Sequence, residues 1–178
     1  KAALQALTPY GEAVRQAAES GLPMLFAGSA MELLGRRITD QQGKDWEALG
    51  LAGFLSRETE KRFVEDVCGA CPLFPEPVVG FQNKSAVITG IETPLLTSLA
   101  MGYGNDGENR QEGYQKGNVF ASALTGPILE KNPALLREVA RRVLAHAGAE
   151  TPETIPLDEA LEQGYAVTAE QLRKRAEG

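Results

Sequence analysis

The stretch LPMLFAGSAMELLG, residues 22–35, has the residue types of a turn that presents a nucleophile. Its apolar run at residues 23–27 predicts a short buried strand, and residues 30–35 predict a helix that a glycine ends. Between them, Gly28 and Ser29 predict a tight turn. A strand–turn–helix elbow of this kind holds a nucleophile on the turn, close to backbone N–H groups that stabilise an oxyanion. Ser29 carries a hydroxyl, but serine needs a general base, and no histidine is close to it in sequence.

Cys68 and Cys71 stand in the sequence CGAC, a spacing that redox and zinc sites use. A zinc site needs four ligands, and the chain offers only these two thiols and His146, which lies in a helical context. A thioredoxin-type motif would place Cys68 at the start of a helix, whereas the surrounding sequence predicts a strand that ends in a proline-bounded loop. We therefore expect two ordinary thiols and no metal or other cofactor, with a disulfide or a shared metal site as the alternative.

The composition favours a single acidic domain. The 178 residues are 43% hydrophobic, which suffices for one core but not comfortably for two. A formal charge of -6 and a pI near 5.0 give no reason to expect DNA, RNA or an anionic membrane surface as a partner, because these select clustered Lys and Arg. No apolar run approaches the roughly 20 residues that span a bilayer, so we expect a cytoplasmic protein. The sequence begins with Lys1 rather than Met, and we expect further residues before it.

Helix signals occur before the elbow and in the C-terminal part of the chain. Thr8, followed by a proline, predicts the start of a helix with Tyr10 on its apolar stripe. A strong helix is predicted from residue 133. Its expected buried face consists of Leu136, Val139, Ala140, Val143 and Leu144. Residues 168–171, TAEQ, form a capping box that predicts the start of a last, highly charged helix.

The middle of the chain, from residue 37 to about residue 120, consists of short β-rich segments separated by Gly, Pro and Asn turns. Within it, residues 102–113, GYGNDGENRQEG, predict a hairpin tip or a ligand-binding loop. The helix–strand–helix order around the elbow is typical of doubly wound α/β proteins. We therefore expect an α/β fold whose sheet places the elbow at the carboxyl ends of its strands.

Five segments occur in the order typical of class I glutamine amidotransferases of the cobyric acid synthase type: FAGSAMELLG, KRFVEDV, VVGFQN, GYGNDGENRQEG and NVFASALTGPILEKNP. Over roughly residues 10–145 the chain resembles this family, and within it the GatD-like group. The resemblance implies a flavodoxin-like, mostly parallel sheet flanked by helices, with N-terminal strands that would precede Lys1. Residues 1–148 would form the amidotransferase-like domain, and residues 149–178 a C-terminal helical extension of the same domain.

The resemblance also implies that both catalytic positions are vacated. The family's elbow reads approximately Cys-Gly-Gly-Tyr-Gln-Leu-Leu-Gly, which places Gly28 where the nucleophilic cysteine would stand. The family's histidine lies in a Thr-Tyr-Leu-His-Gly-Pro stretch that matches SALTGP here, which places Thr125 at the position of the base. If this register is right, Gly28 and Thr125 lie close together.

Three residues are candidates for substrate binding. Arg62 in EKRF matches an arginine that helps to hold glutamine in the GatD-like group, and a guanidinium suits a carboxylate because it binds it in a bidentate fork. The alternative is a surface arginine on a strand. Gln82, in GFQNKS, stands where the family has a glutamate, and Lys84 departs from the family's histidine. Ser29 of the elbow is the third candidate.

The GatD-like enzymes pass ammonia to an ATP-dependent Mur-ligase-like partner, MurT, which amidates the peptidoglycan stem peptide. The resemblance therefore implies a MurT-like ligase as a possible partner and a glutamine-like molecule as a possible ligand. Three hypotheses remain open at this point. The chain is a catalytically degenerate partner subunit, an active glutamine amidotransferase that releases ammonia, or a stand-alone small-molecule binding protein.

Overall fold

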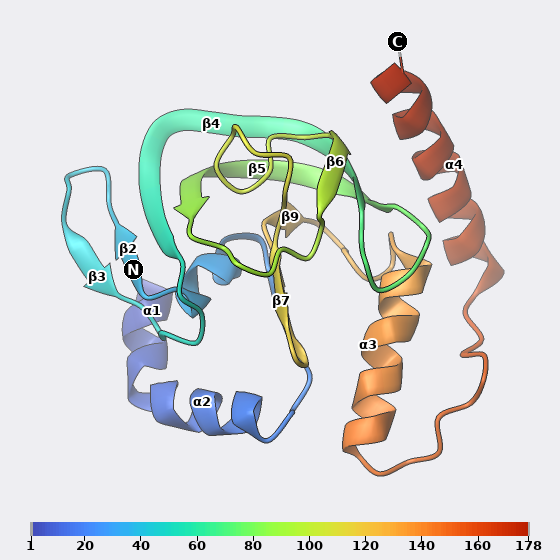
Figure 1. The fold of residues 1–178 in the computed structure, drawn as a ribbon, viewed down its shortest axis with the longest axis horizontal. Helices are drawn as coiled ribbons and strands as arrows, with labels where there is room; N and C mark the ends of the chain where they lie inside the picture. The colour runs from blue at the N-terminus through green and yellow to red at the C-terminus, as the bar shows by residue number, and fades with distance from the viewer. Residues whose placement is uncertain (1, 178) are drawn as a thin grey trace.

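The computed structural model describes residues 2–177, which form an α/β structure (Figure 1). The α-helices are α1 (Ala2–Leu7), α2 (Gly11–Glu19), α3 (Pro133–His146) and α4 (Glu159–Glu177). Two 3-10 helices are η1 (Thr8–Tyr10) and η2 (Gly28–Leu34). The strands are β1 (Met24–Ala27), β2 (Arg37–Thr39), β3 (Asp45–Glu47), β4 (Leu55–Ala70), β5 (Val78–Thr89), β6 (Ser98–Met101), β7 (Tyr114–Lys116), β8 (Val119–Ser122) and β9 (Leu124–Thr125).

The strands form two mixed sheets. The smaller sheet has the order β1-β8-β7, in which β1 and β8 run parallel and β7 and β8 antiparallel. The larger sheet has the order β3-β2-β4-β5-β9, and β6 pairs with β4. Its β2–β4 pairing is parallel and its other pairings are antiparallel. The α/β class is thus as expected, but the described residues do not form a mostly parallel sheet, and β1 lies at an edge rather than in the centre.

The connections explain why antiparallel pairing predominates. Consecutive parallel strands need a crossover of a dozen or more residues, which is usually a helix. In the described chain no α-helix lies between α2 and α3, so the strands of this region fold back on one another. β4 and β5 pair as one long hairpin, from Leu55 opposite Thr89 to Gly69 opposite Val78. The parallel pairing of β1 with β8 instead joins segments that are far apart in sequence.

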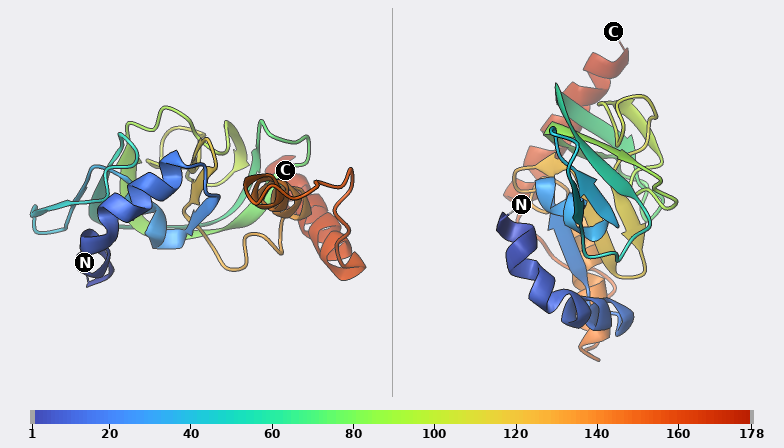
Figure 2. Two further views of the ribbon diagram at one scale, coloured as in Figure 1. Left: turned by 90° about the horizontal axis from the view of Figure 1, so that it is seen from below. Right: turned by 90° about the vertical axis from the view of Figure 1, so that its left-hand side faces the viewer.

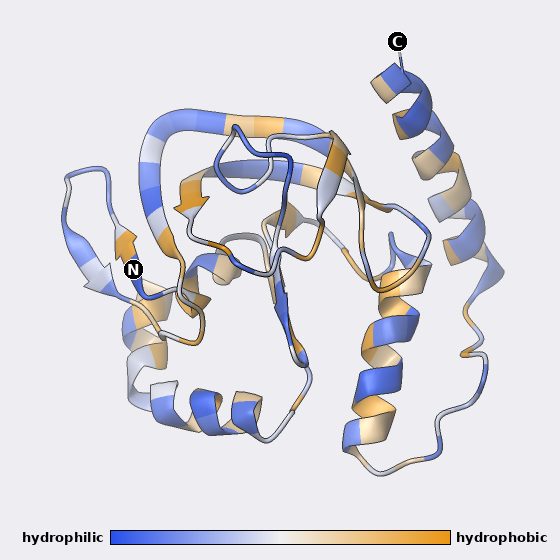
Figure 3. Ribbon diagram, viewed as in Figure 1, coloured by the Kyte–Doolittle hydropathy of each residue, from blue (hydrophilic) through white to orange (hydrophobic). Residues whose placement is uncertain are grey.

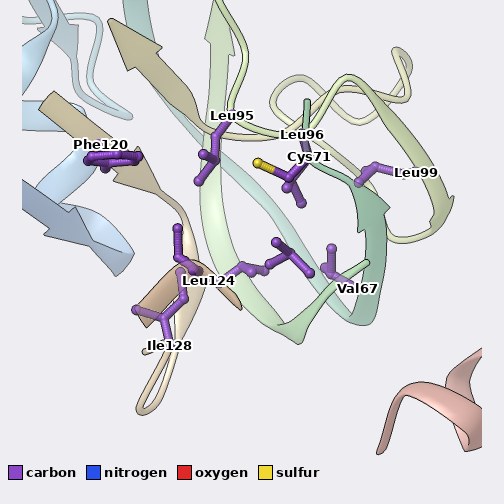
Figure 4. Packing of buried hydrophobic residues seen from close by; sticks show 10 residues of the cluster. Val67, Cys71, Leu95, Leu96, Leu99, Phe120, Leu124 and Ile128 are labelled. Atoms are coloured by element: carbon purple, nitrogen blue, oxygen red, sulfur yellow. The ribbon is translucent and has the colours of Figure 1, made fainter. Parts of the chain in front are cut away.

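Two apolar clusters hold the sheets together and fix the elbow. Figure 4 shows the main cluster, in which Val67, Phe120 and Leu124 from three different strands are fully buried. The second cluster contains Met31 and Leu34 of η2, both with no exposed surface. Full burial of such a side chain contributes about 1.5–3 kcal/mol, so these two residues fix η2, and with it the turn at its start, against the sheet.

Helix α3 begins at Pro133 as expected, and Val139 of the expected face packs against the main cluster, but the fully buried residue of the helix is a different one. Leu135 is fully buried in the main cluster, whereas Val143, expected on the buried face, is 49% exposed. The residue before the helix explains this orientation, because the Asn132 side chain bonds the N–H and the carbonyl of Val79 in β5. This pairing fixes the first turn of α3 on the sheet, and further along the helix Arg142 donates to Gly117 and Asn118 in the β7–β8 turn.

Helix α4 begins ten residues earlier than its capping box predicts. It starts at Glu159 because the carboxylate of Asp158 accepts the N–H of Ala160, whereas the Thr168 hydroxyl donates to the carbonyl of Gly164 within the helix. Leu172 packs against Cys68 and other residues of the large sheet. In Figure 1 α4 runs beside the C-terminal end of β4, and Figure 3 colours it with both hydrophilic and hydrophobic residues along its length.

The N-terminal helices also differ from the sequence prediction. Thr8 does not cap a helix: it begins η1, and its hydroxyl donates to the carbonyl of Leu4 in the preceding helix α1. Tyr10, expected on an apolar stripe, is 63% exposed. Figure 2 shows α1 and α2 lying together along one side of the molecule. In the part of the chain that the structure describes, no helix is both long and apolar enough to cross a membrane.

Candidate functional site

The turn of the elbow lies where β1 ends and η2 begins. Gly28 has φ 62°, a left-handed conformation that suits glycine and that a sharp strand-to-helix turn requires. A Cβ added at Gly28 would meet Cγ2 of Thr125 at 3.9 Å and no other atom more closely. The expected proximity of these two positions is therefore confirmed. Both follow the parallel strands β1 and β8 at their carboxyl ends.

A cavity of about 120 Å³ opens beside the turn, and we call it the elbow cavity. Three residues that the sequence singled out line it: Gly28, Ser29 and Arg62. Four further polar residues on its wall were not predicted as site residues: Glu32, Asn83, Lys84 and Ser85. Among the described residues that line this cavity there is neither a cysteine nor a histidine. The cavity therefore has the polar groups of a binding site without a thiol or an imidazole.

Lys84 is the most perturbed cation of the site. It is 9% exposed, and burial lowers the pKa of its ammonium from 10.5 to about 8, while the carboxylates of Glu112, Glu32 and Asp106 limit the fall. The ammonium donates a hydrogen bond to the carbonyl of Asn105. In the structure every second residue of β5 from position 82 to position 88 is buried, but the sequence QNKSAVI shows no alternation of apolar and polar residues that would have identified Lys84.

Glu32 brings a carboxyl group to the same wall. Burial raises its pKa, and Glu58 raises it further, whereas the hydroxyl of Ser56, which donates to Oε2 at 2.5 Å, lowers it. Nothing in the sequence of the elbow identified this residue, because its burial depends on β4, which lies more than twenty positions downstream.

Arg62 projects from β4 at an exposed position and donates a hydrogen bond to Oδ1 of Asn83 on the neighbouring strand β5. Its partner is thus a neutral amide, which leaves the positive charge of the guanidinium available to an anion. The structure places Arg62 on the wall of the elbow cavity, as a substrate-binding role requires.

Gln82 lies elsewhere. Its side chain has no exposed surface and donates from Nε2 to the carbonyl of Gly104 at 3.1 Å, while Oε1 has no partner among the described residues. It does not line the elbow cavity, so the structure does not bring it together with Ser29 and Arg62. Its contact is with the Gly-Asn loop instead.

The loop of residues 102–113 holds the segment that carries Thr125. Asn105 exchanges two hydrogen bonds with the backbone of Gly113, at 3.0 and 3.2 Å. Glu112, fully buried, accepts the N–H of Ala123 at 2.7 Å and the hydroxyl of Ser122 at 2.9 Å. The loop predicted as a hairpin tip or a ligand-binding loop therefore hydrogen-bonds residues 122 and 123, just before Thr125.

The two cysteines and the histidine are distant from this chemistry. Cys71 belongs to the main apolar cluster, and Cys68 packs beneath α4 with Leu172. Both are free and 5% exposed, and burial raises the pKa of each thiol. His146 is the last residue of α3. Among the described residues no group of three or more His, Cys, Asp or Glu could hold a metal ion.

Comparison with known proteins identifies the family of this chain. Residues 1–133 match the model of the CobB/CobQ-like glutamine amidotransferase domain. The chain therefore belongs to this family.

Two relatives of the chain share one name with each other. The chain is 31% identical over 125 residues to the lipid II isoglutaminyl synthase (glutamine-hydrolyzing) subunit GatD of Staphylococcus aureus (strain N315), over 70% of this chain and 49% of the relative. It is 27% identical over 159 residues to the subunit of that name from Streptococcus pneumoniae (strain ATCC BAA-255 / R6), over 88% of this chain and 61% of the relative.

A third relative has a different named activity. It is the cobyrinate a,c-diamide synthase of Listeria innocua serovar 6a (strain ATCC BAA-680 / CLIP 11262), 30% identical over 138 residues that make up 72% of this chain and 29% of the relative. The chain thus spans between about a third and three fifths of the length of these curated relatives.

Proposed function

We propose that this chain is a catalytically degenerate glutamine amidotransferase domain that acts as the partner subunit of a Mur-ligase-like amidating enzyme of cell-wall metabolism. The observation that carries the proposal is the pairing of Gly28 with Thr125 at the turn of an otherwise intact elbow. A glycine has no side chain to attack an amide, and a threonine hydroxyl does not take up a proton at neutral pH as an imidazole does.

The expected loss of activity is large. In a well-studied protease, removal of the nucleophile or of its base alone costs on the order of 10⁶-fold in turnover, and what remains comes from oxyanion donors and binding. Here neither group stands at its position. The backbone of the elbow and Arg62 would still orient an amide or a carboxylate, but holding a substrate without attacking it is binding rather than catalysis.

The partner follows from the relatives. Two of them are named as a subunit of lipid II isoglutaminyl synthase, and the resemblance to the GatD-like group implies a MurT-like partner. A MurT-like ligase is accordingly the proposed partner of this chain, and without a glutaminase its nitrogen would come from free ammonia. Co-expression with the Mur-ligase-like protein of the same genome tests this. We expect a complex that amidates its acceptor with ammonium salts and not with glutamine.

Restoration of the two catalytic groups tests the degenerate elbow directly. Wild-type protein is expected to release no glutamate from glutamine, Gly28→Cys together with Thr125→His to release some, and Gly28→Cys alone less, because no imidazole generates the thiolate. The cysteine fits sterically, since its Cβ would lie 3.9 Å from Thr125. It adopts a left-handed conformation at a cost of about 1–2 kcal/mol.

Gly28→Ala is the matched control, because it carries the same backbone cost without a thiol. Thermal unfolding of all variants separates loss of fold from lack of activity. Glutamate release by the wild type at ordinary enzymatic rates, in a preparation cleared of other glutaminases, would overturn the proposal in favour of an active amidotransferase.

A second candidate function is a stand-alone small-molecule binding protein. The observation that favours it is the polar wall of the elbow cavity, where Arg62 and Lys84 both donate to neutral oxygens rather than to carboxylates. Failure to form any complex with a Mur-ligase-like protein, together with a ligand retained through purification, would favour this candidate.

A further inference from the structure

A second cavity adjoins the elbow cavity. It has a volume of about 340 Å³ and lies between α1, η2 and the strands β2 and β3, and we call it the apolar cavity. Its wall carries apolar side chains from four elements: Leu4, Leu33, Ile38 and Trp46. Ser29 and Glu32 line both cavities. The two cavities therefore lie next to each other, with these two polar residues in the wall of both.

Their sizes indicate that a ligand would use both. Pockets that enclose small organic ligands measure roughly 300–1,000 Å³. The elbow cavity, at about 120 Å³, is too small to enclose such a ligand alone, whereas the apolar cavity at about 340 Å³ lies in that range. A molecule with a small polar end and a larger apolar body fits this pair of volumes.

The charged residues on the walls are separated in the direction that leads from the elbow cavity to the apolar cavity. Arg62 and Lys84 give the elbow cavity two cations, and their hydrogen bonds go to the amide of Asn83 and the carbonyl of Asn105. The carboxyl group of Glu32 lies in the wall that both cavities share. Glu58 lines the apolar cavity and is close enough to Glu32 to raise its pKa. The order of groups is thus cationic, then acidic, then apolar.

We infer that the two cavities together bind a free α-amino acid with a large apolar side chain. The carboxylate lies at Arg62 and Lys84, the ammonium at Glu32 and Glu58, and the side chain in the apolar cavity. This inference rests on the proposed function, because an active elbow would need the side-chain amide of glutamine, and not the carboxylate of the ligand, beside Gly28.

The same walls disfavour glutamine. Its side-chain amide would enter the apolar cavity, whose polar lining residues are Ser29, Glu32 and Glu58, and in the proposed pose the ligand's ammonium already occupies the two carboxylates. An amide left there without a hydrogen-bond partner costs about 1–3 kcal/mol on the scale of protein mutations. A difference of 1.4 kcal/mol is a tenfold difference in dissociation constant. We therefore expect phenylalanine or leucine to bind at least about tenfold more tightly than glutamine.

Calorimetric titration of the wild-type chain with a matched set of compounds tests the assignment. L-Phenylalanine and L-leucine are the expected ligands, and L-glutamine is the polar competitor. 3-Phenylpropanoate lacks the ammonium group and 2-phenylethylamine lacks the carboxylate, so each is expected to bind at least about tenfold more weakly than phenylalanine. Glutamine binding as tightly as leucine, or no binding of either apolar amino acid, would overturn the inference.

Variants locate the binding. Arg62→Gln and Glu58→Gln are expected to weaken phenylalanine binding, and neither residue is buried, so the fold should persist. Ile38→Trp fills the apolar cavity and should abolish phenylalanine binding. Glu60→Gln, an exposed change on the same strand as Glu58, is the control that should leave binding unchanged. Phenylalanine binding that survives both Ile38→Trp and Arg62→Gln would place the ligand elsewhere and refute the assignment.

The glutaminase assay keeps the two proposals distinguishable. Wild-type protein that hydrolyses glutamine overturns the proposed function. Wild-type protein that neither hydrolyses glutamine nor binds apolar amino acids leaves the proposed function standing and refutes only the present inference.

Discussion

Replacement of Lys84 by methionine should make the protein's stability less dependent on pH. The ammonium of Lys84 is buried, and its pKa falls from 10.5 to about 8 on folding. The unfolded chain therefore binds more protons than the folded chain between pH 8 and pH 10.5, and the stability of the wild type rises with pH in this window. Below pH 8 Lys84 is charged in the folded protein as well, and the full cost of burying its charge then lowers the free energy of unfolding.

The size of the effect follows from the two pKa values. Between pH 7 and pH 10, deprotonation of Lys84 should add about 2.5 kcal/mol to the free energy of unfolding of the wild type, at 1.36 kcal/mol per pKa unit. Lys84→Met lacks this contribution. At pH 7 the variant gains by removing a buried charge, but it loses the hydrogen bond to Asn105 and the charge that favours ionised Glu112. The pH dependence is thus the sharper measurement.

Urea unfolding at pH 7, 8, 9 and 10 provides the assay. We expect the stability of Lys84→Met relative to the wild type to fall by about 2.5 kcal/mol from pH 7 to pH 10. Lys61→Met, at an exposed position on β4, changes the net charge equally and serves as the control. A stability difference between Lys84→Met and wild type that stays constant across this range would refute the reasoning.

Three further changes test the framework of the site by chemical denaturation. Asn132→Ala should cost about 2–4 kcal/mol, because it leaves the N–H and the carbonyl of Val79 without their buried partner; a cost under 0.5 kcal/mol would contradict this. Glu112→Ala should cost at least about 2 kcal/mol, because the N–H of Ala123 is left unpaired, whereas Glu112→Gln should cost less. Leu172→Ala should cost about 2–3 kcal/mol and shift a single unfolding transition if residues 149–178 belong to the same domain, as we propose, and a separate transition for α4 would contradict that proposal.

The strand and the turn of the elbow could be predicted because they depend on residues that are adjacent in the sequence. An apolar run, a glycine and a further short helical segment specify a strand and a turn whatever the rest of the chain does. The position of Thr125 could be predicted only through the family resemblance, since no local pattern relates it to Gly28. The start of α3 was likewise clear, because proline suits the first turn of a helix.

What could not be predicted depends on contacts between distant segments. The cavity wall formed by Glu32, Asn83 and Lys84 needs the pairing of β4 with β5 and the placement of η2 against them. The expectation of a mostly parallel sheet came from the family resemblance, whereas the strands between α2 and α3 have no intervening α-helix, of the kind that parallel crossovers usually use, in the described chain. Helix α4 was misplaced because two capping signals compete, at Asp158 and Thr168, and the earlier one prevails.

The separation of the two cysteines provides a built-in pair of reporters. Each thiol is 5% exposed, but Cys68 lies beneath α4 and Cys71 in the main cluster. A thiol reagent reacts with each only when its own cover opens, and such openings differ in free energy from one part of a protein to another. The rates at which single-cysteine variants react would therefore report the detachment of α4 and the opening of the core independently.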